Sequence, residues 1–153
     1  MIVAQCKIET SYTPPRRWFW VRVYDTPEAL REIAHRVDPG SDYSTCVGTV
    51  QEITPWIPED EDLDQQDDLP ISDLWFPDSG VAGVVRLCLD YLSPEVVQHE
   101  VFHAACTVFR MNISQRPRLE GFLDENRNNE EALAYAVGQL AAGMDEELRK
   151  RFE

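Results

Sequence analysis

The sequence predicts an α+β fold in which two strands, a helix and a third strand precede a fourth strand and a helical C-terminal part. Three observations predict it. Runs of β-branched and aromatic residues indicate the strands, capping residues precede apolar stripes of helical spacing, and 153 residues with 43% hydrophobic and 27% charged side chains suit one globular domain over 1–153.

The first 55 residues predict the order strand, strand, helix, strand. Residues 2–8 and 18–24 are rich in β-branched and aromatic side chains and favour strands. Thr26 suits the N-cap of a helix that ends at the turn-forming residues 38–40. The β-branched stretch 45–53 predicts the third strand.

The second half predicts one further strand and a set of helices. The nearly continuous apolar run 81–89 favours an interior or near-edge strand. Ser93 suits the N-cap of a helix that continues to about residue 111. After a polar loop we expect a third helix over about 128–143 and a short charged helix over 145–152.

The chain is strongly acidic, with 28 Asp and Glu against 14 Lys and Arg and a net charge of −14. Much of the excess falls in a long irregular insertion at about 55–80, in which residues 59–73 hold acids and no base. Such a charge repels a phosphate backbone and argues against nucleic acid as a partner. The run also lacks the glycine and the final glutamate of a calcium loop, so a solvated loop is expected there.

Compartment and redox state follow from what the sequence lacks. No apolar run approaches the roughly 18–20 residues of a membrane helix, and the start lacks the order of a signal peptide. The four cysteines show no Cys-x-x-Cys spacing and lie in apolar surroundings, so we expect reduced thiols. These observations predict a cytoplasmic protein that does not associate with a membrane.

The second predicted helix contains the pattern H-E-x-x-H at His99, Glu100 and His103. Residues four apart lie on one face of a helix, so two imidazoles can reach one metal ion at roughly 2.0–2.1 Å. Glu100, one step around the helix, can take a proton from a water on the metal as that water attacks a carbonyl. An apolar stripe elsewhere on the helix supplies its core face, so packing does not require either histidine. The pattern predicts a zinc site.

A catalytic zinc site needs a third protein ligand. His35, in the first predicted helix, is most simply a surface or half-buried residue, and Phe109 stands where a longer histidine motif would place its third ligand. Cys106 is a conceivable ligand, but an ordinary helix cysteine is the simpler interpretation. A downstream carboxylate is therefore expected, and the candidates are Glu120, Asp124, Glu125, Glu130 and Glu131.

The motif together with residues 131–138, Glu-Ala-Leu-Ala-Tyr-Ala-Val-Gly, resembles the gluzincin metallopeptidases. It is similar in particular to the small prokaryotic and phage-type members, including minimal gluzincins and ImmA/IrrE-like peptidases, over about residues 81–143. The resemblance implies a zincin-like fold, with a small mixed sheet and one helix before the active-site helix. It also implies that His99, His103 and Glu131 bind zinc and that Glu100 is the general base.

Two alternatives remain open for this second motif. Glu130 is the other possible ligand, and Asn128 as N-cap would give Glu131 a structural role in a capping box. Tyr135 stands where the family often has Asp or Asn, and a phenol there could orient a ligand histidine or donate to an oxyanion.

The expected function is zinc-dependent hydrolysis of a peptide bond, with narrow specificity for a peptide or protein substrate. A peptide would pair with an exposed sheet edge, for which strand 81–89 is the candidate, and Arg116 and Arg118 could hold a substrate carboxylate. The alternative is an acidic binding or inhibitor protein of a phage-encoded kind, on an inactive or structural zincin scaffold.

Overall fold

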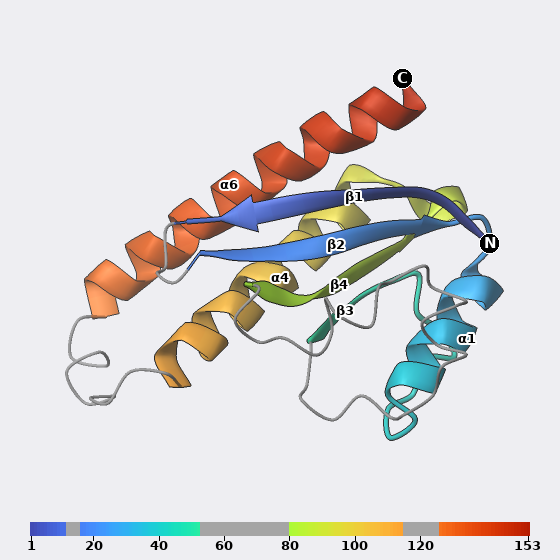
Figure 1. Ribbon diagram of the computed structural model, residues 1–153, viewed down its shortest axis with the longest axis horizontal. Coiled ribbons are helices and arrows are strands. Elements are labelled where there is room, and N and C mark those ends of the chain that lie inside the picture. Colours follow the sequence, from blue (N-terminus) through green and yellow to red (C-terminus); the bar gives the residue numbers. More distant parts are fainter. Residues whose placement is uncertain (12–15, 53–79, 115–125) are drawn as a thin grey trace.

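A computed structural model gives the fold as a four-stranded sheet with helices on both faces (Figure 1). The structure describes residues 1–11, 16–52, 80–114 and 126–153. Within these residues the elements follow the predicted α+β order, with two strands, a helix, two further strands and then helices. The predicted insertion at 55–80, including its acids, lies almost wholly outside the described residues.

The sheet has the order β1-β2-β4-β3 and is mixed, as expected. β1 (Ile2–Thr10) pairs antiparallel with β2 (Arg17–Tyr24). β2 pairs parallel with β4 (Val81–Cys88), and β4 pairs antiparallel with β3 (Gly48–Glu52). β3 is therefore shorter than the predicted 45–53, whereas β1 extends beyond the predicted 2–8.

The placement of β4 corrects one expectation. Every residue of β4 is buried, and the strand lies between β2 and β3. Its continuous apolar run thus indicates an interior strand, and 81–89 cannot be the edge that receives a peptide. Among the described strands the edges are β1 and β3.

Two predicted N-caps are confirmed. The backbone N–H of Ala29 donates to Thr26 Oγ1 at 3.2 Å at the start of α1 (Pro27–Val37). The N–H of Val96 donates to Ser93 Oγ at 3.3 Å, and α4 (Pro94–Ser114) begins at the next residue. A short 3-10 turn, Leu89–Tyr91, joins β4 to α4.

The last part of the chain is one helix, α6 (Asn126–Phe152), rather than the two that were predicted. Gly143 lies inside it and does not end it, because Leu140, Met144 and Leu148 all pack against the core on the two sides of the glycine. Ion pairs four residues apart, such as Arg149 with Asp145, support the last turns. Asn128 also lies inside α6, so the capping box proposed for Glu131 is wrong.

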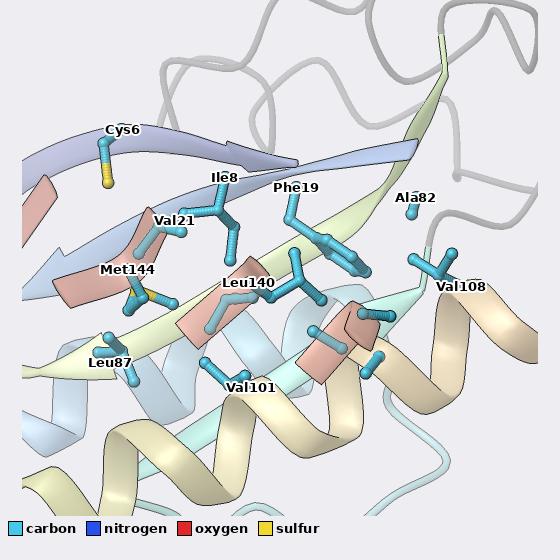
Figure 2. Close-up of a cluster of buried hydrophobic side chains, with 14 of the residues drawn as sticks. Cys6, Ile8, Phe19, Val21, Ala82, Leu87, Val101, Val108, Leu140 and Met144 are labelled. Carbon is cyan, nitrogen blue, oxygen red and sulfur yellow. The ribbon is translucent and has the colours of Figure 1, made fainter. Parts of the chain in front are cut away.

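The two faces of the sheet carry different helices. Consecutive residues of a strand point to opposite faces, and Val23 and Leu87 belong to a core cluster with α4 and α6, whereas Tyr24 and Cys88 pack with α1. Figure 2 shows the larger cluster, in which side chains of the strands, α4 and α6 converge, with Phe19, Val101 and Leu140 among those labelled.

Buried polar contacts connect β3 to β4 and α1. Gln51 Nε2 donates to the carbonyl oxygen of Ala34 in α1 at 2.7 Å. Arg86 Nε donates to Gln51 Oε1 at 2.8 Å, and Arg86 Nη1 donates to the Tyr24 hydroxyl at 2.7 Å. Because each of these groups is buried, breaking one bond leaves an uncompensated polar group, and the register of β3 is held firmly.

Neither a long apolar helix nor a disulfide occurs among the described residues. None of the helices described is long and apolar enough to cross a membrane. All four cysteines are free thiols, as expected, with Cys6 and Cys88 buried and Cys46 and Cys106 half-buried.

We predict that Gly83→Ala destabilises the fold by about 2–4 kcal/mol. A Cβ atom at Gly83 would lie 2.2 Å from the carbonyl oxygen of Gln51, in the backbone of the paired strand. The measurement is the free energy of unfolding from urea denaturation. Gly138→Ala is the matched control, because a Cβ atom there meets nothing within 4 Å and alanine favours a helix by about 0.5–1 kcal/mol. Equal stability of the two variants would contradict the close approach of β3 and β4.

Candidate metal centre

The packing of α4 decides which way the motif faces. Val101, Ala104, Ala105 and Val108 are all fully buried against the sheet and α6. This confirms the predicted core face of the helix. His99 and His103 lie off that face and are exposed, so both imidazoles project from the body of the protein on one side of α4.

The two imidazoles meet each other. His99 Nε2 and His103 Nε2 are 3.1 Å apart, and the ring centroids are 4.7 Å apart. In neutral rings one Nε2 would have to donate a proton to the other; a cation between them instead accepts both lone pairs. Two nitrogens bound to one zinc ion in tetrahedral geometry are about 3.3–3.4 Å apart. The histidine pair therefore fits a metal ion with little rearrangement.

Glu100 lies beside the pair but is buried, with 4% of its surface exposed. It is covered by Gly48 at the start of β3: a Cβ atom at that position would lie 2.8 Å from Glu100 Oε1. Burial raises the pKa of the Glu100 carboxyl from 4.5 to about 7. A carboxyl with a pKa near neutrality can both accept and return a proton, as a general acid and base must.

A pocket of about 230 Å³ joins these three residues to the edge of the sheet. β3 forms one wall and α4 the other. A second pocket, on the N-terminal side of α4, also reaches His99 and Glu100 and is lined by Cys46 and Glu95. The residues lining the first pocket are Gly48, Thr49, Val50, His99, Glu100, His103, Cys106, Thr107 and Arg110.

Several of these lining residues were not identified from the sequence. Thr107 and Arg110 follow His103 at four and seven residues, a helical spacing that could have indicated them. Gly48 carries no comparable signal, because its role depends on β3 crossing over α4 and not on any local pattern. The Thr107 hydroxyl donates to the carbonyl oxygen of His103 at 3.0 Å and so also contacts the motif.

The structure does not supply the third ligand. In the part of the chain that it describes, no group of three His, Cys, Asp or Glu side chains is arranged to hold a metal ion. Glu131 is exposed on α6 and does not join the histidines in such a group. The side chain of Glu130, and the whole of Glu120, Asp124 and Glu125, lie outside the described residues. A carboxylate ligand stays a prediction.

The remaining candidates have mixed outcomes. Tyr135 is 53% exposed on α6 and does not line the pocket between β3 and α4, and its role stays a prediction. Cys106 is half-buried in the pocket wall, and burial raises the pKa of its thiol. His35 is exposed, as expected. Arg116 and Arg118 lie outside the described residues.

Comparison of the chain with protein-family models, with curated proteins and with solved structures found no match.

We predict that Glu100→Gln stabilises the metal-free protein at neutral pH. An acid whose pKa rises on folding contributes stability below its unfolded pKa, near 4.5, and that contribution is lost as the pH rises toward 7. Between pH 4.5 and 8 the free energy of unfolding of wild type should therefore fall by on the order of 2 kcal/mol relative to that of the variant.

The check is urea denaturation of both proteins in a chelator across this pH range. Glu95→Gln is the control, because Glu95 is an exposed acid in the first turn of the same helix, and its substitution should leave the slope unchanged. Parallel curves for wild type and Glu100→Gln would contradict the burial of the carboxylate.

Proposed function

We propose that this protein is a zinc-dependent metallopeptidase with a zincin-like arrangement, in which His99 and His103 bind the metal and Glu100 is the general base. The observation that carries the proposal is the pair of imidazole nitrogens, 3.1 Å apart, at the mouth of a pocket that also contains a buried carboxyl. The mixed sheet, with a helix before α4 and another after it, agrees with the fold that such enzymes have.

The bound zinc ion would act as a Lewis acid toward the peptide carbonyl and the attacking water. The residues of the chain do the remaining work. Glu100, held next to Gly48, takes a proton from the water as the oxygen of the water bonds to the carbonyl carbon. The same carboxyl then delivers that proton to the amide nitrogen as the C–N bond breaks.

The substrate would lie along β3. β3 is an edge among the described strands and forms the wall of the pocket opposite α4. An extended peptide can add to such an edge through backbone hydrogen bonds, which hold it independently of its sequence. Because Gly48 lies directly over Glu100, a peptide paired with the start of β3 would bring one of its carbonyls beside the histidines.

The first test is metal binding. We expect wild type to bind about one zinc ion per chain and His103→Ala to lose affinity at least about a hundredfold, because the pair then has one nitrogen only. Competition with a chromophoric chelator measures the affinity, and metal analysis gives the stoichiometry. His35→Ala, which removes an exposed histidine on α1, should bind as wild type does. Equal affinity in wild type and His103→Ala would contradict the site.

The same titration identifies the third ligand. Glu131→Ala and Glu130→Ala are neighbouring substitutions on α6. Only the substitution that removes the true ligand should lower the zinc affinity, by tenfold or more. If neither substitution changes the affinity, the ligand is neither Glu130 nor Glu131, and Glu120, Asp124 and Glu125 are the candidates to substitute next.

The second test separates an enzyme from a binding protein on an inactive scaffold. Glu100→Gln should keep the bound zinc but lower the rate of peptide cleavage by about 10²–10⁴, the contribution of a general base. The measurement is cleavage of a mixed peptide library, followed by mass spectrometry. A wild-type protein that binds zinc and cleaves nothing, yet captures a basic partner through the acids of 59–68, would favour the binding protein.

A further inference from the structure

The guanidinium of Arg110 lies at the end of the pocket away from the histidines. Arg110 follows His103 by two helical turns on the same face of α4, and both residues line the pocket. The wall opposite is β3, whose last residue, Glu52, lies at the same end as Arg110. The pocket thus runs from the candidate metal centre at Gly48 to the arginine at Glu52.

Arg110 is only weakly engaged within the described part of the chain. Its Nη2 lies 3.5 Å from Glu52 Oε2 and 3.5 Å from Thr107 Oγ1, and both contacts are at the limit of a hydrogen bond. The arginine side chain is 69% exposed. An exposed ion pair of this kind contributes little to stability, whereas a guanidinium can hold a carboxylate through two short parallel bonds. A better-placed carboxylate can therefore replace Glu52.

The spacing along α4 fixes where that carboxylate would be. Seven residues of helix rise about 10.5 Å, and an extended peptide advances about 3.3 Å per residue. An acidic side chain that reaches Arg110 would therefore belong to a residue about three positions from the one whose carbonyl lies next to the histidines.

The direction of the peptide fixes which side of the bond it occupies. β3 runs from Gly48, over Glu100, to Glu52, beside Arg110. Antiparallel pairing is somewhat more stable than parallel pairing, and an antiparallel peptide would run from Arg110 toward Gly48. Its residues near Arg110 would then lie on the N-terminal side of the bond that is cut.

We propose that Arg110 determines substrate specificity by binding an Asp or Glu side chain at the third or fourth position N-terminal to the cleaved bond. The inference rests on the proposed peptidase function and adds a substrate class to it. The chemistry recognised is a carboxylate, and the free C-terminus of a peptide is the other source of one. A peptide bound parallel to β3 would present that terminus to Arg110.

The experiment is cleavage-site profiling with a random peptide library whose members exist with free and with amidated C-termini. Wild type should enrich Asp and Glu about tenfold at the third or fourth position before the cut, equally in both forms of the library. Arg110→Gln should lose the enrichment, and Arg110→Glu should replace it with Lys and Arg. Arg149→Gln is the matched control, because Arg149 is 64% exposed and pairs with two acids one helical turn away, Asp145 and Glu153.

A binding measurement supplies a second readout that does not need turnover. Zinc-loaded Glu100→Gln should bind the best cleaved acidic peptide about tenfold more tightly than its Asn or Gln counterpart, and the double variant with Arg110→Gln should bind both equally. Here fluorescence anisotropy with a labelled peptide gives the dissociation constants.

Each other outcome overturns the inference in a distinguishable way. If Arg110→Gln still cleaves with the same acidic enrichment, a group other than Arg110 binds the carboxylate. Enrichment that needs a free C-terminus would show that the peptide runs parallel to β3. If the zinc-loaded wild type cleaves nothing, the peptidase function itself fails, and the specificity inference fails with it.

Discussion

The close packing of α4 on the sheet is the constraint on which the site depends. Ala104 and Ala105 are fully buried, and side chains of this size let a helix approach its neighbours closely. Val101 and Val108, one turn to either side, fix the rotation of the helix by packing into the same core. Because this packing sets the rotation of the helix, His99 and His103 face outward and toward β3.

β3 then completes the site from the other side. Every second residue of β3 lies on the face toward α4, namely Gly48, Val50 and Glu52. Gln51 points to the opposite face, where it is hydrogen-bonded to Ala34 and Arg86. The same strand therefore carries a structural network on one face and the cover of Glu100 on the other. Burying a carboxyl in this way costs stability but brings its pKa to about 7, a combination that is typical of functional sites.

Local signals in the sequence predicted what local physics controls. The N-caps at Thr26 and Ser93 were predictable because a capping side chain bonds to its own first turn. The outward direction of His99 and His103 followed from the apolar stripe of the same helix. The break expected at Gly143 was wrong, because burial of Leu140 and Met144 on one core outweighs the roughly 1 kcal/mol by which glycine weakens a helix.

The position of β3 at the edge, with β4 inside, could not be deduced in the same way. Strand order is set by contacts between residues far apart in the chain, such as Gln51 with Gly83, and no local pattern encodes it. The sequence by itself determined two histidines and a glutamate on one helix, because a helical repeat is a property of neighbouring residues. Only the tertiary structure decided that a glycine covers the glutamate and that Arg110 closes the pocket, because both depend on which strand crosses that helix.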